Sequence, residues 1–321
     1  MRMLMLAIAS SPAVVLVGPP GTGKTELMSR VIHTLNVDPE RFGFSRGDLD
    51  GEVVTPEEDW GFQDLVLGQT LRDGEISALE GELLQAIAKD QWLLLDEMNR
   101  ADMDRIFGGL LTWLSGKRVK VGNWSGRDSS PVYLDWDTGN AASHVDISSS
   151  GARDYVAGKD WRLIGTYNGV DAQRVFRMGQ ALGRRFKHIP IAPASPAQFE
   201  TIVSGYVSDD DLGQFVAKRV VALYSAHFET ERAKLGPGLF LDIPAYVQAG
   251  VTAYGGAAES APQSELIDEL LTEAYFSSVG SMLSRFDRLV LDNLRDALLQ
   301  QSALSAQSWD WIEQNIPTLR S

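Results

Sequence analysis

The sequence predicts an α/β fold in its first part and a mostly helical domain in its second part. Up to about residue 190, short β-branched or apolar runs alternate with stretches of helical periodicity, which is the pattern of a parallel sheet covered by helices. Beyond that point, residues 199–228, 245–254 and 264–300 keep helical periodicity without a convincing strand. The 321 residues, 44% of them hydrophobic, are enough for one large or two ordinary domains with sizeable cores.

The chain is expected to open with an amphipathic helix over residues 1–11 that packs beside the first strand. The alternative is a short signal peptide, since Arg2 precedes the apolar run Leu4–Ala9. We reject it because cleavage near Ser11 would fall directly before a strand that leads into a glycine-rich loop. Five runs are expected to form the sheet: Ala13–Val17, Phe42–Ser45, Trp92–Leu95, Leu163–Tyr167 and His188–Ile191.

An insertion is expected at about residues 117–160, and a domain boundary near residue 194. The insertion is rich in Gly, Ser and Asp, and its apolar residues alternate with polar ones, which predicts a hairpin. At the boundary, Ser195–Gln198 combines an N-cap serine, a proline at the first helical position and a capping-box glutamine. We therefore place an α/β domain at residues 1–193 and a smaller all-α lid with the C-terminal helices at residues 194–321.

Composition and charge exclude several classes of protein. The 29 Lys and Arg residues against 43 Asp and Glu residues leave a formal charge of −14, which argues against a stand-alone nucleic-acid binder. The absence of cysteine excludes disulfide frameworks, thiolate zinc sites and iron–sulfur clusters. No stretch reaches the roughly 18 apolar residues of a membrane span, so we expect a cytoplasmic protein without membrane contact. The histidines lack the spacing of a metal site and are expected to be structural or on the surface: His33, His144, His188 and His227.

Residues 18–25, Gly-Pro-Pro-Gly-Thr-Gly-Lys-Thr, match the phosphate-binding (Walker A) pattern G-x-x-x-x-G-K-[ST] between a strand and a helical run. In such a loop the backbone N–H groups surround the β-phosphate, Lys24 reaches the β- and γ-phosphates, and the Thr25 hydroxyl ligates Mg²⁺. The alternative, a glycine-rich connecting turn, is disfavoured because the glycines, the lysine and the threonine all occur in the required context. The expected nucleotide-binding residues are Gly18, Pro19, Pro20, Gly21, Thr22, Gly23, Lys24, Thr25 and Glu26.

Two further strands end in polar residues that suit hydrolysis. The apolar run Trp92–Leu95 is followed by Asp96, which is expected to hold magnesium through water, and by Glu97, the candidate general base (Walker B). A later strand ends at Asn168, whose amide can hold the lytic water opposite Glu97. In isolation the acidic pair favours a solvated turn or helix cap, and the asparagine favours a turn. Together with the phosphate loop, the functional interpretation is the stronger one.

A basic stretch near the end of the first domain contains Arg184 and Arg185, and leaves two interpretations open. Cations at a helix C-terminus stabilise the helix dipole, which is common. Alternatively, one of them is an arginine finger that stabilises the γ-phosphate charge in the site of a neighbouring subunit. Three further cations lie in the same stretch: Arg174, Arg177 and Lys187.

The order of these motifs resembles that of the AAA+ ring ATPases over about residues 12–191. Leu95–Ala101 is similar to the D-E-[IM]-N-R-A signature of the dynein-related, MoxR and McrB branch, and Phe62–Glu75 lies where that branch carries its helix-2 insert. The resemblance implies a P-loop NTPase that uses ATP or GTP with Mg²⁺. It also implies a homo-oligomeric ring, expected to be a hexamer, with sites at the subunit interfaces. Because most members of the branch retain the arginine before the Phe, Arg185 is the expected finger, and Arg184 is expected either to orient it or to contact the same phosphate.

Three features resemble McrB, the nucleotide-hydrolysing motor of modification-dependent restriction. Leu182–Phe186 is similar to its L-R-R-R-F, with Gly183 in place of the first arginine, and Asn168–Asp171 is similar to its N-T-A-D. Leu235–Leu239 resembles its lid motif, and the lid has no Ser-x-Arg, the sensor-2 arginine usual in MoxR-type members. No room remains before Ala13 for the DNA-reading domain of the restriction motor, so we expect either that a partner supplies targeting or that the function differs from that of the restriction motor.

The expected function is a ring NTPase that couples hydrolysis to movement of a partner or DNA, with a nuclease partner in phage defence. McrB carries the segment N-T-A-D-R, and this chain matches only about half of it. ATP is therefore favoured over GTP. Two alternatives stay open: a MoxR-like chaperone that remodels or activates a client protein, and a nucleotide-gated scaffold without turnover.

Two surface features suggest nucleic-acid contact, each with a more ordinary explanation. The insertion begins with the cations Lys117, Arg118 and Lys120, which suit DNA, although a solvated surface is the commoner meaning of neighbouring cations. Four tryptophans suit base stacking, although core packing is the better expectation: Trp113, Trp124, Trp136 and Trp161.

Overall fold

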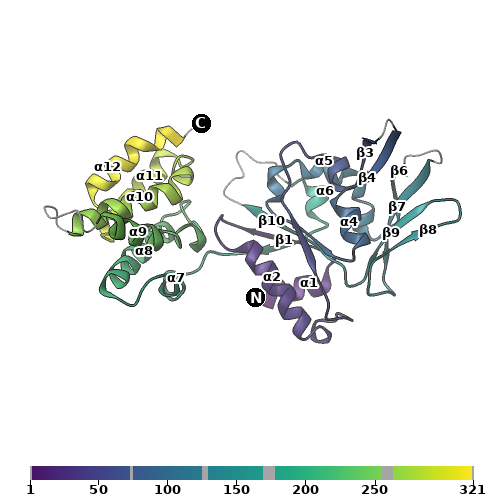
Figure 1. The fold of residues 1–321 in the computed structure, drawn as a ribbon, viewed down its shortest axis with the longest axis horizontal. Coiled ribbons are helices and arrows are strands. Elements are labelled where there is room, and N and C mark those ends of the chain that lie inside the picture. Colours follow the sequence, from purple (N-terminus) through teal and green to yellow (C-terminus); the bar gives the residue numbers. More distant parts are fainter. Residues whose placement is uncertain (1, 73–74, 125–128, 169–177, 255–262, 320–321) are drawn as a thin grey trace. The chain divides into compact units, whose positions relative to one another are not determined.

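The computed structural model describes residues 2–72, 75–124, 129–168, 178–254 and 263–319 (Figure 1). Its contacts divide the chain into two compact units. The first unit comprises residues 1–18 and 24–191, and the second comprises residues 19–23 and 192–321. The predicted α/β P-loop fold with a helical C-terminal region is confirmed, and each unit is described here by itself.

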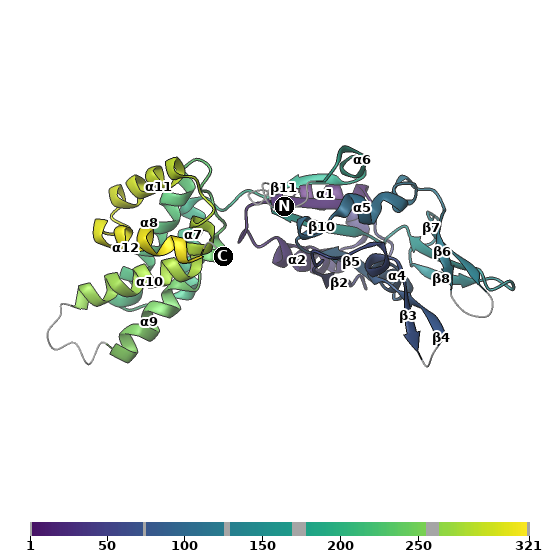
Figure 2. The ribbon, with the colours of Figure 1, turned by 90° about the horizontal axis from the view of Figure 1, so that it is seen from above.

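The first unit is built around a five-stranded parallel sheet with strand order β11-β1-β10-β5-β2. The strands are β1 (Ala13–Gly18), β2 (Gly51–Val54), β5 (Trp92–Leu95), β10 (Leu163–Asn168) and β11 (Lys187–Pro190). The central strands are apolar along nearly their whole length because a parallel sheet is buried on both faces. The helices around it are α1 (Arg2–Ser10), α2 (Lys24–Val37), α3 (Phe62–Leu65), α4 (Glu82–Ala88), α5 (Met103–Phe107) and α6 (Gln180–Gly183) (Figure 2).

Four of the five predicted strands and the opening helix are confirmed, but the strand predicted at residues 42–45 is wrong. Residues Glu40–Phe42 form a 3-10 turn instead, and Gly43, at a φ of +80°, ends it in the left-handed region. Phe44 then packs into the core, with its ring 5.7 Å from that of Trp92. A short apolar run suits a buried turn as well as a strand, so the sequence pattern did not separate the two. The strand at the edge of the sheet beside β5 is β2 instead.

The interval at residues 117–160 forms a second, four-stranded sheet with strand order β6-β7-β9-β8. Neighbouring strands are antiparallel except for the central pair, β7 and β9, which is parallel. The side of β7 that carries Val132 and Leu134 is buried in the core of the first unit. The strands are β6 (Val119–Trp124), β7 (Ser130–Asp137), β8 (His144–Ile147) and β9 (Arg153–Gly158).

Three tryptophans pack together where this sheet meets the core. The rings of Trp113 and Trp136 stack at 4.7 Å, and Trp161 lies edge-on to both at 5.9 and 5.8 Å. Each indole N–H donates to a backbone carbonyl, which satisfies the polar end of each ring. Core packing therefore accounts for these three residues. The ring of Trp124 lies 4.0 Å from the guanidinium of Arg153.

A two-stranded hairpin follows α3 at the place expected for the helix-2 insert. It consists of β3 (Leu67–Arg72) and β4 (Glu75–Glu80), which pair antiparallel. The hydroxyl of Tyr155, on β9, donates a hydrogen bond to the Glu80 carboxylate at the end of the hairpin. The hairpin and the four-stranded sheet are thus joined by a side-chain contact.

The second unit is a helical bundle with its own hydrophobic core. The predicted helix start at Ser195 is confirmed, because its hydroxyl and backbone N–H form the capping box with Gln198. None of the helices described in either unit is both long enough and apolar enough to cross a membrane. The helices of the second unit are α7 (Pro196–Val203), α8 (Asp211–Glu229), α9 (Ile243–Tyr254), α10 (Gln263–Leu283), α11 (Arg288–Gln300) and α12 (Ala306–Asn315).

Candidate nucleotide-binding and hydrolytic site

The sheet brings three of the predicted motifs to one edge. Strand β10 lies between β1 and β5, and all three run parallel, so their carboxyl ends meet at the same side of the sheet. Gly18, the first residue of the phosphate loop, pairs in register with Asn168. Asp96 and Glu97 follow directly after β5. Residues more than seventy positions apart in the sequence therefore become neighbours.

Lys24, Asn168 and Glu97 form a continuous chain of hydrogen bonds. The buried Nζ of Lys24 donates to the carbonyl of Gly18 at 3.2 Å and to Oδ1 of Asn168 at 2.6 Å. The amide nitrogen of Asn168 donates in turn to Oε1 of Glu97 at 3.0 Å. Burying an ammonium group requires such acceptors around it. The predicted phosphate-binding lysine, asparagine and general base thus lie in direct contact.

A second set of contacts surrounds Asp96. The hydroxyl of Thr25 donates to Oδ2 at 2.8 Å, and the hydroxyl of Thr166 donates to Oδ1 at 2.6 Å. A carboxylate beside a hydroxyl offers the hard oxygen ligands that Mg²⁺ prefers, with phosphate and water oxygens completing its shell. Thr25 and Asp96 therefore fit the predicted magnesium site. No cluster of three or more His, Cys, Asp or Glu side chains that could hold a metal ion occurs among the described residues.

Glu97 occupies a strained backbone position at the start of a turn. Its φ of +52° and ψ of +49° lie in the left-handed region, and residues Met98–Arg100 continue as a 3-10 turn. A non-glycine residue there costs roughly 1–2 kcal/mol, and such strain is common at functional sites. The turn also places the buried side chain of Asn99 where its Oδ1 accepts the backbone N–H of Asn168 at 3.0 Å.

Thr166 and Asn99, which no sequence motif marks as functional, both support the predicted residues. Thr166 is fully buried, donates to Asp96 and accepts the backbone N–H of Glu97 at 2.8 Å. One signal was present in the sequence: Thr166 lies two positions before Asn168, and residues at that spacing face the same side of a strand. Asn99 lies inside the D-E-M-N-R-A signature, which was used only as a family marker.

With this geometry established, the comparison with protein families is decisive. Residues 13–186 match the model of the AAA domain, dynein-related subfamily. The chain belongs to this AAA family. It is therefore an AAA+ ATPase, and membership implies nucleotide binding and hydrolysis, which in this family is usually Mg²⁺-dependent, and assembly into rings. No curated protein matches the chain.

The apex of the phosphate loop of this AAA+ ATPase, residues 19–23, contacts the Leu235–Leu239 motif within the second unit. The backbone N–H of Gly236 donates to the carbonyl of Pro20 at 2.9 Å, and that of Gly238 donates to the carbonyl of Gly21 at 2.8 Å. A Cβ on Gly236 would lie 2.1 Å from the carbonyl carbon of Gly21, so this close approach requires glycine. The motif that suggested a lid therefore contacts the phosphate loop directly.

Arg184 and Arg185 lie at the C-terminal end of α6 in the AAA domain. Nη1 of Arg185 donates to the carbonyl of Ala181 at 2.5 Å, which is the contact expected of a cation at a helix terminus. Phe186, which follows, is buried edge-on to Phe107 at 6.2 Å and anchors the segment. The finger role requires a second subunit and stays a prediction. Five residues named with these motifs lie outside the described residues: Gly169, Val170, Asp171, Arg174 and Arg177.

Two of the three cations at the start of the insertion, Arg118 and Lys120, have acidic neighbours in the four-stranded sheet. Arg118 pairs with Asp154 at 2.7 Å, and its guanidinium lies 3.6 Å from the ring centroid of Tyr133. The hydrogen bond to Asp154 raises the pKa of Arg118. Lys120 shares a cross-strand row with Tyr133, Asp154 and Asp146, so this face carries compensating acids. The arrangement favours the solvated-surface interpretation over direct DNA contact.

Proposed function

We propose that this AAA+ ATPase hydrolyses ATP, or alternatively GTP, with Mg²⁺ in a homo-oligomeric ring, expected to be a hexamer. The observation that carries the proposal is the connected set Lys24–Asn168–Glu97 at the end of the sheet, beside the Thr25–Asp96 pair. A turn that only connects a strand to a helix does not require a buried ammonium, an amide and a carboxylate linked by hydrogen bonds. A phosphate-cleaving site needs all three.

Each residue has a distinct role in the proposed reaction. Lys24 offsets the charge of the β- and γ-phosphates, and the loop N–H groups orient them. Glu97 accepts the proton of the attacking water. When Lys24 engages the phosphates it leaves Oδ1 of Asn168, which can then accept a hydrogen bond from that water. Thr25 and Asp96 would hold Mg²⁺, which neutralises charge on the phosphate oxygens.

The test separates binding from turnover. Lys24→Ala is expected to abolish nucleotide binding because it deletes the cation that faces the phosphates, whereas Glu97→Gln is expected to keep binding and stop turnover. Thermal shift with ATP and with GTP measures binding, and phosphate release measures turnover. Lys89→Ala, which removes an exposed cation paired with Glu52 at 3.1 Å, is the control and should behave as the parent protein. Equal loss of binding in Lys24→Ala and Glu97→Gln would refute the division of roles.

For the biological role, we propose a McrB-like motor that works in the cytoplasm with a nuclease partner in DNA restriction and phage defence. The contact of Gly236 and Gly238 with the phosphate loop supports this role, because the McrB-like lid motif occupies a functional place. The acidic neighbours of Lys120 favour DNA contact through the partner or the ring pore rather than through the insertion.

The alternative is a MoxR-like chaperone that remodels or activates a client protein, and two additions to the turnover assay separate the roles. Stimulation of phosphate release by a nuclease with DNA supports the motor. Stimulation by a folded client protein without DNA supports the chaperone.

A further inference from the structure

Glu97 has a hydrogen bond at one carboxylate oxygen and an ion pair at the other. The side-chain amide of Asn168 donates to Oε1 at 3.0 Å, and Nη1 of Arg100 lies 3.6 Å from Oε2. A carboxylate oxygen has two lone pairs, so each can also accept a hydrogen bond from water. The hydrogen bond at one oxygen and the ion pair at the other together favour one orientation of the carboxylate over the alternatives that a single contact would allow.

The turn after β5 brings Arg100 to Glu97. Glu97 lies in the left-handed region, the next three residues form the 3-10 turn, and the backbone N–H of Arg100 donates to the carbonyl of Glu97 at 2.9 Å. Residues three positions apart in such a turn lie above one another. The turn thus brings the guanidinium of Arg100 near the carboxylate of Glu97 in the same segment.

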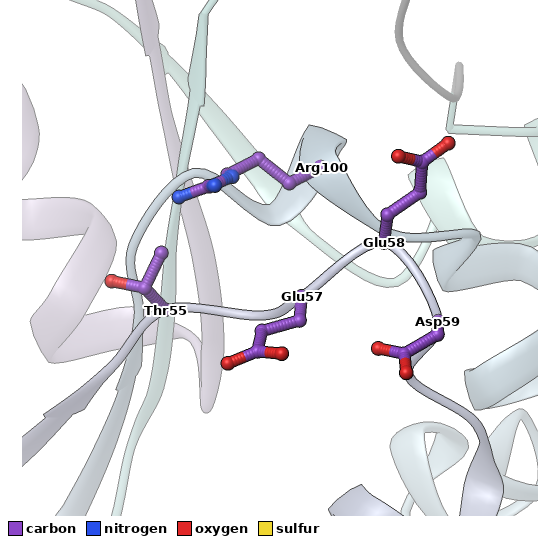
Figure 3. Close-up of a pocket in the computed structure, with 5 residues that line it drawn as sticks. All are labelled: Thr55, Glu57, Glu58, Asp59 and Arg100. Atoms are coloured by element: carbon purple, nitrogen blue, oxygen red, sulfur yellow. The ribbon is translucent and has the colours of Figure 1, made fainter.

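Arg100 also borders a cavity of about 630 Å³ (Figure 3). Strand β2, the neighbour of β5, ends at Val54, and the loop after it supplies the other lining residues: Thr55, Glu57, Glu58 and Asp59. Figure 3 shows Arg100 reaching over this loop from the turn after β5. Among the described residues that line the cavity, Arg100 is the cation and Glu57, Glu58 and Asp59 are the acidic residues. Its ion pair is nevertheless with Glu97, which lies outside that acidic loop.

We propose that Arg100 is a positioning residue for hydrolysis. Its guanidinium holds the Glu97 carboxylate in the orientation that accepts the proton of the attacking water. The inference rests on the proposed role of Glu97 as general base. Because Arg100 contacts Glu97 and not the phosphate loop, it acts on turnover and leaves nucleotide affinity unchanged. Lysine keeps the charge but lacks the planar fork of arginine, so it replaces Arg100 only in part.

The first experiment compares turnover with affinity. Arg100→Met keeps an unbranched side chain about as long as the aliphatic stem of arginine and removes the guanidinium, and is expected to lower kcat by about 10- to 100-fold, the cost of a misplaced catalytic group. KM, nucleotide affinity and ring assembly by light scattering should match the parent protein. Arg100→Lys should recover part of kcat. Lys89→Met, which removes a cation from another exposed ion pair of the same unit, is the control and should leave kcat unchanged.

A mixing experiment decides whether Arg100 acts on the Glu97 of its own subunit. In rings mixed from Arg100→Met and Glu97→Gln subunits, every subunit carries a defect in its own site, so activity should not rise above the residual activity that the Arg100→Met subunits contribute. Recovery would mean that Arg100 serves a neighbouring site and would overturn the proposal. Normal kcat in Arg100→Met, or a loss explained by weaker binding or assembly, would also overturn it.

The proposed function fails separately from this inference. If Glu97→Gln alone keeps full turnover, the role of Glu97 is refuted. If Glu97→Gln is inactive while Arg100→Met is fully active, only the positioning role of Arg100 is refuted.

Discussion

At the scale of single residues, the site depends on a buried hydroxyl that touches no substrate in the proposed reaction. Thr166 donates to Asp96 at 2.6 Å and accepts the backbone N–H of Glu97 at 2.8 Å. One side chain thereby ties the residue proposed for magnesium to the residue proposed as base. Because Thr166 is fully buried, water cannot replace either hydrogen bond.

Thr166→Val is therefore expected to damage both stability and turnover. Valine matches threonine in shape but leaves the Glu97 amide without its acceptor and Asp96 without a donor. We expect the free energy of unfolding to fall by about 1–3 kcal/mol, the usual cost of a buried unsatisfied group. Phosphate release should fall by about tenfold or more, since both carboxylates lose a support. Urea unfolding and phosphate release measure the two effects. Thr166→Ser keeps the hydroxyl and should retain most of both, and a fully active Thr166→Val would contradict the assignment.

At the scale of elements, the packing of the second unit includes one buried histidine. His227, on α8, has no exposed surface, and it links that helix to α10 and to the following loop. Its Nδ1 lies 2.8 Å from the carbonyl of Ala233, and its Nε2 lies 2.7 Å from the hydroxyl of Tyr275. A carbonyl only accepts, so Nδ1 carries the proton and Nε2 accepts from Tyr275. Burial lowers the pKa of His227 to about 4 and raises the pKa of Tyr275.

The lowered pKa of His227 predicts acid sensitivity. Below pH 6.5 the unfolded chain binds a proton at this histidine, and the folded chain does not until about pH 4. The free energy of unfolding therefore decreases as pH falls through this window, by about 1.4 kcal/mol per pH unit and about 3 kcal/mol in all. His227→Gln removes the titration. Urea unfolding from pH 4 to 8 should show the stability difference between parent and variant shrinking below pH 6.5, and a constant difference would contradict the prediction.

At the scale of the whole molecule, the proposed site needs a second subunit. The single chain supplies the phosphate loop, the carboxylates and Asn168, while Arg185 donates to the carbonyl of Ala181 at the end of α6. A capping cation contributes about 0.3–1 kcal/mol to stability and nothing to chemistry. A finger acting across an interface is worth roughly 10³–10⁵ in turnover. These two magnitudes are far enough apart to be separated by experiment.

Mixed rings test Arg185 directly. Arg185→Ala and Glu97→Gln subunits are each expected to be inactive alone. When they are mixed, some interfaces pair an intact Glu97 site with an intact Arg185 from the neighbour, so partial phosphate release should return. Light scattering with saturating nucleotide verifies ring assembly. Full turnover by Arg185→Ala alone would leave the arginine as a helix cap, and no recovery in verified rings would argue against action across the interface.

The sequence by itself determined the fold class, the phosphate loop and the polar residues that end β5 and β10. These signals are local: a buried parallel strand must be apolar, and a phosphate loop needs its glycines, lysine and threonine in fixed order. The failed prediction at residues 42–45 was local as well, but four residues are too few for periodicity to tell a strand from a buried turn.

Only the tertiary structure decided which side chains support the site. Thr166 is an ordinary strand residue in sequence, and the family signature that contains Asn99 and Arg100 does not show what these two side chains touch; the contacts of all three lie across strands or within one strained turn. The same holds for the Leu235–Leu239 motif, whose backbone N–H groups meet carbonyls of the loop apex more than two hundred residues away. A periodic pattern shows which face of an element is buried. It does not show what that face touches, because the partner is chosen by the packing of the whole unit.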